Sequence, residues 1–345
     1  MKNIFCFFII YLFSFHAFAQ EIENAGDYMT AFSNAQVEMD QKYMTYVSAA
    51  AHSSRVRKID RLRTQALESI DKAKYKTMAL PQYQGDNSLR QASIDYVLFC
   101  YRIFNEDYSK IVNMEEIAEQ SVDQMQAYLL LQERTSEKLH EASDNLSNAE
   151  KVFAKKYSVN LVDSKSELSD KMGLSGKVNR YSDRVYIIFF KCNYEDGELF
   201  RALNSAKLTD AEQARNALMS YASEGLQALK TDSLAGFQGN PRLAISCRQS
   251  LEFYNNMAKT DIPKLTDFYL KQENFNKMKA AMEAKGSKRT KEDVEQYNNA
   301  VQDLNRSVSG FNELNDELNH RRAEVVQDWE REEKTFRDEL IPYYK

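Results

Sequence analysis

The sequence is poor in glycine and proline, the residues that most often turn a chain. Its 345 residues contain 10 Gly and 4 Pro, well below average usage of about 7% and 5%. An all-β fold needs turn residues every ~8–12 positions, so this scarcity excludes one. Alanine, glutamate, lysine, glutamine and leucine are abundant instead, and apolar residues recur three to four positions apart. The sequence therefore predicts an all-α protein.

Sequence motifs that carry catalysis or bind cofactors are missing as well. The chain contains no HExxH, glycine-rich phosphate loop, GxSxG or Cys–His pairing. Its formal net charge is −5, with both signs mixed along the chain and no basic block. This pattern argues against nucleic acid or anionic lipid as the main partner. The sequence predicts a protein that is not an enzyme and has no cofactor, catalytic residue or metal site.

Cysteine is scarce and forms no metal-binding pattern. Cys100, Cys192 and Cys247 follow the N-terminal apolar run, and no CxxC spacing occurs among them. An oxidising compartment would permit one disulfide and leave one thiol over. Each of the three, however, lies in a helical pattern among apolar neighbours. Buried, unpaired thiols are therefore favoured over a disulfide.

The N-terminus has the layout of a secretory signal peptide. In "MKNIFCFFIIYLFSFHAFAQ" a lysine precedes an apolar run, and "AFA" places small residues where a signal peptidase reads. The run is shorter than the ~20 apolar residues that span a bilayer, which argues against a membrane anchor. Cys6 lies inside the run, which argues against lipid attachment there. We predict a signal peptide over residues 1–19, export to the periplasm or cell surface, and no transmembrane segment in the mature chain.

Helical periodicity covers most of the remaining sequence. We expect helices at about 24–53, 55–78 and 87–106 in the first half, and at about 177–205, 209–231, 241–258 and 262–284 in the second. Three helix starts carry the residue pair of a capping box, with a hydroxyl residue at the N-cap and an acid three positions later. These pairs are Ser164 with Glu167, Thr209 with Glu212, and Thr290 with Asp293.

Two segments repeat apolar residues every seven positions over a long distance. One runs from Val294 to Phe336 and predicts a helix of about 45 residues. Asn315 and Arg322 interrupt its apolar seam, where polar residues can fix the register or meet a partner helix. The other runs from Ile111 to Phe153 with a smaller, more polar seam. We therefore expect an elongated helical bundle with long coiled-coil-like helices.

A short motif occurs twice. "YQGDNSLR" starts at Tyr83, and "FQGNPRL" starts 154 positions later at Phe237. Each offers an aromatic residue for the core, a glycine free to take a positive φ, and an N-cap for the next helix. Packing positions on the following helices match at the same offset, for example Leu89 with Leu243. We interpret the motif as a duplicated hinge rather than a ligand loop.

The repeated motif predicts the domain organisation. A tandem duplication of a three- to four-helix unit places the first unit at residues 20–156 and the second at 177–345, where it ends in the long heptad helix. The segment 157–176 between them is rich in polar residues and contains Gly173 and Gly176. Because glycine and polar residues favour loops, we expect this segment to connect the two units.

One motif suggests a metal site. Glu137 with His140, and Glu317 with His320, form Glu-x-x-His pairs, a pattern that di-iron helical bundles use when both side chains face the bundle core. The heptads place these residues on or near the outer faces of their helices. His52 has no carboxylate or thiol near it in the sequence. We therefore expect the two Glu-x-x-His pairs to face mostly solvent rather than a metal, and we expect no metal site at His52.

Several stretches resemble a known but uncharacterised family. "KIVNMEEIAEQS", "VYIIFFK", "LTDFYLKQENF" and "YNNAVQDLNRSVSGFNELNDELN" resemble exported, all-helical bacterial proteins that are catalogued as surface proteins. The resemblance implies an envelope or surface location and supplies no catalytic residue. The expected function is a non-enzymatic helical binding or structural module whose partner is a protein or another envelope component. The alternative is a periplasmic bundle that binds a small molecule or a metal.

Overall fold

The computed structural model describes residues 22–53, 55–107, 117–161 and 167–345, and over these ranges the fold is all-α. The first part contains α1 (Ala25–His52), α2 (Val56–Ala79), α3 (Ser88–Arg102), the π-helix η1 (Ile103–Asp107) and α5 (Val122–Lys156). The second contains α6 (Glu167–Asn204), α7 (Leu208–Ala228), the short α8 (Asp232–Ala235), α9 (Arg242–Thr260), α10 (Ile262–Lys285), the 3₁₀ turn η2 (Gly286–Lys288) and α11 (Lys291–Leu340).

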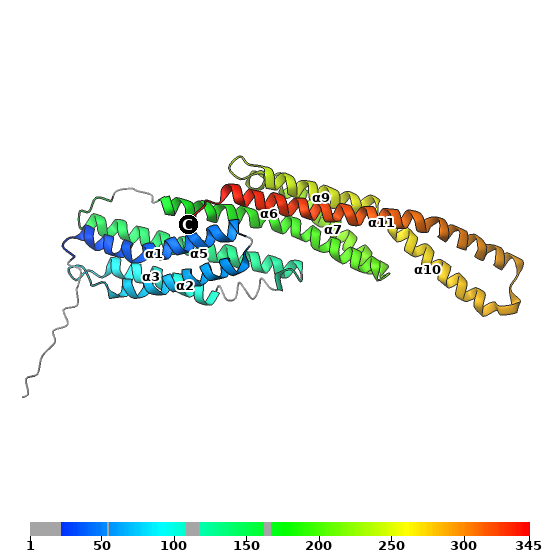
Figure 1. The fold of residues 1–345 in the computed structure, drawn as a ribbon, viewed down its shortest axis with the longest axis horizontal. Coiled ribbons are helices and arrows are strands. Elements are labelled where there is room, and N and C mark those ends of the chain that lie inside the picture. The colour runs from blue at the N-terminus through cyan, green and yellow to red at the C-terminus, as the bar shows by residue number, and fades with distance from the viewer. Residues whose placement is uncertain (1–21, 54, 108–116, 162–166) are drawn as a thin grey trace, which may run out of the picture.

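The helices form two groups that follow each other along an elongated molecule (Figure 1). In the first group α1, α2, α3 and α5 pack in sequence order, and in the second α6, α7, α9 and α11 do so, with α10 against α11. The groups meet where α6 contacts α1 and α5 and where α11 contacts α1. Antiparallel neighbours joined by short connections are typical of helical bundles. The predicted all-α, elongated bundle is confirmed.

The apolar periodicity of each helix determines which face is buried. In the second group one continuous core collects side chains from α6, α7, α9 and α11, including Leu199, Leu218, Leu251 and the stacked pair of Phe189 and Trp329. The first group is held by smaller separate clusters, one around Tyr28, Phe32 and Phe153 and another around Ile70 and Val97. Because a larger continuous cluster removes more apolar surface from water, the second group has the stronger core.

The helix starts confirm one predicted capping box and correct another. At Thr290 both hydrogen bonds of the box form, since Thr290 Oγ1 accepts from Asp293 N at 3.1 Å and Asp293 Oδ2 accepts from Thr290 N at 3.0 Å. The box predicted at Thr209 is wrong because α7 already begins at Leu208. Its acid, Glu212, accepts a hydrogen bond from Arg215 instead. Ser164 of the third pair lies outside the described residues.

The two long heptad segments both form helices. α11 spans 50 residues, close to the predicted length. α5 begins at Val122 rather than at Ile111, which lies outside the described residues, because Ser121 caps it by accepting a hydrogen bond from Gln124 N at 3.1 Å. Along α5 the predicted seam is the buried or half-buried face, with Leu146 and Phe153 fully covered.

The segment expected to connect two units is helical over half its length. α6 begins at Glu167, so Gly173 and Gly176 lie inside a helix rather than in a loop. A glycine in a helix costs about 1 kcal/mol relative to alanine, a cost that tertiary packing of a 38-residue helix can offset. The division of the chain at 157–176 stays a prediction.

Both copies of the repeated motif form the same turn. Tyr83 and Asp86 exchange backbone hydrogen bonds of 3.1 and 2.8 Å, and Phe237 and Asn240 exchange two of 2.9 Å. The central residues have φ of 49° and 81° in the first turn and 48° and 85° in the second. Positive φ at both central positions defines a type I′ turn and explains the glycine in each. The predicted positive φ is confirmed.

An aromatic cluster packs beneath each turn. Tyr83 lies 5.2 Å from Tyr28 and 5.7 Å from Phe153, measured between ring centroids. Phe237 lies 5.5 Å from Tyr181 and 6.1 Å from Phe336. The hydroxyl of Tyr28 donates to the backbone oxygen of Pro81, and that of Tyr181 donates to the backbone oxygen of Leu234. Each turn is therefore fixed to its group by one aromatic side chain and one tyrosine hydrogen bond.

Arg322, which interrupts the seam of α11, pairs within its own chain. Its Nη2 lies 2.6 Å from Oδ2 of Asp196 on α6, a carboxylate whose side chain is only 6% exposed. Its guanidinium also lies 3.5 Å from the ring centroid of Phe200. Asn315, the other interruption, is half-buried. The seam residue Arg322 thus fixes α11 against α6.

The three cysteines after the N-terminal apolar run are buried and form no disulfide with one another. Cys100, Cys192 and Cys247 are free and buried, and burial raises the pKa of the Cys247 thiol well above its usual value. A protonated, inaccessible thiol is a poor nucleophile.

Among the helices of the described chain, none combines the length and hydropathy that crossing a membrane requires.

His52 connects the two groups of helices. Its Nδ1 lies 2.9 Å from Oδ1 of Asp338, its Nε2 lies 3.0 Å from the backbone oxygen of Ile341, and its ring stacks on Tyr343 at 3.7 Å. The backbone N–H of Tyr344 donates to Ser48 Oγ on α1. The sequence around His52 gives no sign of this carboxylate, because Asp338 is 286 residues away along the chain.

Replacing His52 with alanine is expected to lower the free energy of unfolding by roughly 2–3 kcal/mol, since it removes two hydrogen bonds from a buried side chain. Urea unfolding followed by circular dichroism would measure the change. His140→Ala is the matched control, because the His140 side chain is 76% exposed and surface substitutions change stability by about 0.5 kcal/mol or less. Equal effects of the two variants would show that His52 does not join the groups.

Candidate functional site

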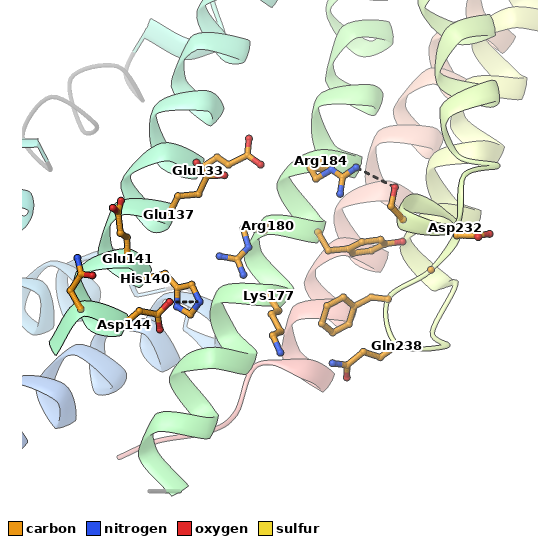
Figure 2. Close-up of a pocket in the computed structure, with 15 residues that line it drawn as sticks. Glu133, Glu137, His140, Glu141, Asp144, Lys177, Arg180, Arg184, Asp232 and Gln238 are labelled. Carbon is orange, nitrogen blue, oxygen red and sulfur yellow. Dashed lines mark hydrogen bonds and ion pairs between the residues drawn. The ribbon is translucent and has the colours of Figure 1, made fainter. Parts of the chain in front are cut away.

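A cleft separates α5 of the first group from α6 of the second. Its outer chamber has a volume of about 810 Å³ and lies between α5, α6 and the turn around Phe237. Figure 2 shows the labelled side chains of α5 on one wall and Lys177, Arg180 and Arg184 of α6 on the other. The two groups of helices meet here, and ligand sites are common at such interfaces.

An inner chamber of about 420 Å³ adjoins the outer one. Its wall combines polar side chains, among them Asp183 and Arg337, with a group of aromatic rings. The rings belong to Tyr43 and Tyr46 of α1, Phe104 of η1 and Tyr128 of α5. Glu133 and Arg180 line both chambers. They also line a third cavity of about 280 Å³. These two residues therefore mark the point at which the cavities adjoin.

The two walls of the outer chamber carry opposite charges. Glu133, Glu137 and Glu141 are four residues apart and share one face of α5, while α6 places Lys177 and Arg180 on the facing wall. Within the described chain no ion pair of 4.0 Å or less joins the two walls. Opposite charges that are held apart by a cavity leave their interactions available to a ligand.

Arg180 is the central cation of the cleft. Its guanidinium is half-buried and donates one hydrogen bond, of 3.3 Å, to Ser136 Oγ on α5. A guanidinium carries five N–H donors in a planar arrangement that suits a carboxylate. In Figure 2 the Arg180 side chain extends into the space between α5 and α6. Arg180 can therefore bind an anionic group in the cleft without losing an existing ion pair.

Asp183 lies one helical turn beyond Arg180 and lines the inner chamber. Burial raises the pKa of its carboxyl to about 6, and the nearby Glu333 and Glu133 raise it further, while Arg337 at 3.5 Å opposes the shift. A carboxyl in this state is stabilised by an additional positive charge. Arg337 already supplies one positive charge beside Asp183, and the raised pKa shows that a second cationic group could still stabilise the carboxylate.

The Glu-x-x-His residues are placed in separate regions. Glu137 and His140 line the rim of the outer chamber, where His140 Nε2 lies 3.7 Å from Asp144. His320 on α11 pairs with Glu324 at 3.3 Å, and its side chain is 73% exposed. The exposure expected from the heptads is confirmed. The described residues contain no group of three or more His, Cys, Asp or Glu that could hold a metal.

Sequence reasoning missed the residues at the centre of this cleft. Arg180 and Asp183 come from α6, Glu133 from α5 and Tyr43 from α1, so no local motif contains them. A usable signal exists in the charge pattern, because α5 carries an acidic row and α6 a basic row at helical spacing. That the rows face each other follows only from how α5 and α6 pack.

The candidate site is a cleft with one acidic wall, one basic wall and an aromatic inner chamber. Such a cleft can bind and orient a ligand through Arg180, Glu133 and Asp183. The family resemblance noted in the sequence receives no support from comparison with known proteins. No family model, curated protein or solved structure matches this chain.

Proposed function

We propose that the protein is a non-enzymatic binding module of the bacterial cell envelope, exported through its N-terminal signal peptide to the periplasm or cell surface. Its expected partner is a protein. The observation that carries a binding role is a pair of helices that projects beyond the rest of the second group (Figure 1). We call this pair the arm and define it as residues 269–317.

The side chains of the arm are only partly buried. Phe268 on α10 and Leu318 on α11 are buried at its base, but every side chain from 269 to 317 is half-buried or exposed. Phe275 and Tyr297 pack against each other with centroids 5.4 Å apart. Each helix of a pair is covered by the other on one side only. The apolar side chains at the border of the contact between α10 and α11 therefore remain open to a third helix.

Both helices of the arm carry exposed apolar side chains. Leu270 is 45% exposed, Val294 is 42% exposed and Val308 is 37% exposed. A third helix with an apolar stripe would cover such residues and gain about 25 cal/mol for each Å² that it removes from water. Helix-in-groove binding uses this kind of contact. The proposed partner therefore contributes an amphipathic helix.

The charged residues of the arm indicate which charges the partner helix should carry. The α10 part of the arm carries more basic than acidic residues, with Lys271, Lys277, Lys279 and Lys285. Three of these lysines pair with acids of the same chain, and Lys279 has no such ion pair within the described residues. The α11 edge of the arm is mainly acidic, with Glu292, Glu295, Asp303 and Glu313. Complementary charges favour the correct partner and its orientation. We expect the partner helix to carry acidic residues along one edge and basic residues along the other.

Site-specific photocross-linking in the native cell tests the proposal. A benzophenone amino acid at Val294 or Val308 is expected to capture one defined envelope protein, and the adduct should disappear when Lys277 and Lys279 are replaced with glutamate. The same probe at Val152, which is 65% exposed on α5, is the matched control. An equal adduct at Val152, or none from the arm, would overturn the proposal.

We also propose that the two groups of helices arose by tandem duplication. Three correspondences support this: the two type I′ turns, the aromatic clusters beneath them and the tyrosine hydrogen bonds that anchor them. Tyr28 and Tyr181 are 153 residues apart, as are their acceptors Pro81 and Leu234. Phe153 and Phe336, which pack on the turns, are 183 apart, so the arm represents an extension of the second unit.

A second candidate function is small-molecule binding in the periplasm. The cleft between α5 and α6 favours it, because its volume lies in the ~300–1,000 Å³ range of ligand sites. Arg180, which has no ion pair among the described residues, and the raised pKa of the Asp183 carboxyl also point to a ligand. The cleft and the arm are separate, so the two candidate functions can be tested independently.

A further inference from the structure

We propose that the cleft between α5 and α6 binds a small zwitterion with an apolar or aromatic body, of the class of the apolar amino acids. Its carboxylate would contact Arg180, its ammonium would lie between Glu133 and Asp183, and its side chain would enter the inner chamber. This inference rests on the second candidate function and names the ligand class for that same cleft.

The carboxylate is assigned to Arg180 because this guanidinium is half-buried and its one hydrogen bond within the described chain is to a neutral hydroxyl. Arginine binds carboxylates through two parallel N–H···O bonds. Lys177, one turn earlier on α6, adds positive charge at the same wall. A ligand carboxylate thus supplies the acceptor that the chain does not provide.

The ammonium is assigned to Glu133 and Asp183. Asp183 follows Arg180 by three residues, so the two side chains lie on one face of α6 about one helical turn apart. This separation suits a molecule whose carboxylate and ammonium are close together. Glu133 approaches from α5 and already raises the pKa of Asp183. A bound ammonium would reverse this effect, because it stabilises both ionised carboxylates.

The apolar body is assigned to the inner chamber. Its volume of about 420 Å³ exceeds what a single apolar side chain occupies, and it is bordered by rings from three different elements. The rings of tyrosine and phenylalanine provide large apolar surfaces against which the apolar body of a ligand can pack. The charged outer chamber and the aromatic inner chamber adjoin at Arg180, where the two ends of one ligand would separate.

Ligands of a single charge fit less well. A simple anion would meet Arg180 but also Glu133, Glu137 and Glu141, which repel it. A simple cation would meet Lys177 and Arg180 in the same way. A neutral ligand would displace water from both walls and leave their charges without a partner, which is costly. Only a molecule that carries both signs satisfies both walls.

Isothermal titration calorimetry with the full mature chain and a matched ligand series tests the ligand class. L-phenylalanine, N-acetyl-L-phenylalanine, L-phenylalaninamide and N-acetyl-L-phenylalaninamide share one side chain but differ in charge, and leucine, methionine, tyrosine and tryptophan vary the side chain. We expect at least one free amino acid to bind, and each of its blocked forms to bind at least tenfold more weakly.

Two variants assign the charges. Arg180→Gln is expected to weaken binding of the free amino acid at least tenfold and to make the acid and its amide bind equally. Glu133→Gln should do the same for the free and N-acetylated acids. Arg201→Gln is the control, because Arg201 lies on the same helix with a 70% exposed side chain and is not among the residues that line the cleft.

The pH dependence gives an independent readout. Arg180 on the same helix, Glu133 of α5, and Glu333 and Arg337 of α11 surround Asp183. Since its carboxyl has a pKa of about 6, it is ionised above this pH, and affinity for the amino acid should rise between pH 5 and pH 7. Asp183→Asn should remove this rise and lower the affinity at pH 7.

The outcomes separate the two levels of the proposal. If no compound of the series binds, both small-molecule binding of this class and the zwitterion assignment are wrong. If a blocked form binds as tightly as its free acid, the cleft binds ligands but the zwitterion assignment is wrong. Tighter binding of the free acid that Arg180→Gln leaves unchanged would place the site elsewhere and overturn the proposal.

Discussion

Replacing Asp196 with alanine is expected to lower the free energy of unfolding by about 3–5 kcal/mol, because it leaves the Arg322 guanidinium partly buried without its counter-charge. Arg322 Nε lies 2.8 Å from both carboxylate oxygens of Asp196, and Nη2 lies 2.6 Å from Oδ2. The arginine side chain is 19% exposed, so water cannot replace the lost partner fully. Chemical denaturation at pH 7 would measure the effect.

A double variant distinguishes the loss of the pair from loss of packing. In Asp196→Leu/Arg322→Met no charge remains, and apolar side chains of similar length cover Phe200. Replacing a buried ion pair with apolar residues is often neutral or stabilising, so the double variant should recover most of the stability lost by Asp196→Ala. If Asp196→Ala costs less than about 1 kcal/mol, the pair contributes little to the attachment of α11 to α6.

Much of the fold could be predicted because its signals are local. The heptads of α11, the capping pair of Thr290 and Asp293, and the glycine of each type I′ turn all lie within a few residues of the structure they determine. Such signals act in the isolated segment and persist after packing. The all-α class, the long helices and the turns were therefore accessible from the sequence.

Other features depend on packing between distant segments. Gly173 and Gly176 favour a loop locally, yet they lie in α6 because the helix continues into the contacts that α6 makes with α1 and α5. At Thr209 the capping pattern was present, but α7 begins one residue earlier. Local propensity is a weak predictor where tertiary contacts decide the outcome.

The candidate site depends even more on contacts between distant segments, which the local sequence does not reveal. Arg180 of α6 and Glu133 of α5 are adjacent only because the two groups of helices meet at this cleft. His52 has an unremarkable sequence environment, but its partners lie at the far end of the chain. The charge rows of α5 and α6 were visible in the sequence. Their opposition across a cavity required the structure.

The aromatic clusters under the two turns are expected to contribute strongly to stability. Phe153 and Phe336 each pack beneath one of the turns and are 1% and 0% exposed. Each packs on a turn aromatic and on a tyrosine, at 5.5 Å from Tyr28 for Phe153 and at 5.6 Å from Tyr181 for Phe336. Replacing either phenylalanine with alanine is expected to cost about 3–5 kcal/mol, from lost burial and from the cavity left behind.

The helices in which amide hydrogen exchange increases show whether the two groups are separate units. Phe153→Ala should increase amide hydrogen exchange mainly in α1, α3 and α5, because its core cluster draws on those helices. Phe336→Ala should act mainly on α6, α9 and α11. Val152→Ala is the matched control for the first variant, since Val152 is 65% exposed on the same helix and should change stability by about 0.5 kcal/mol or less.

The double variant adds a stricter test. Distant sites without shared partners have effects on stability that add within about 0.5 kcal/mol, so two units with separate cores should lose the sum of the two single effects. Phe153 and Phe336 belong to different core clusters, and additivity is the expected result. If either single variant instead raised exchange equally in both groups, the chain would unfold as one cooperative unit. The similarity of the two turns would then describe local packing and not two domains.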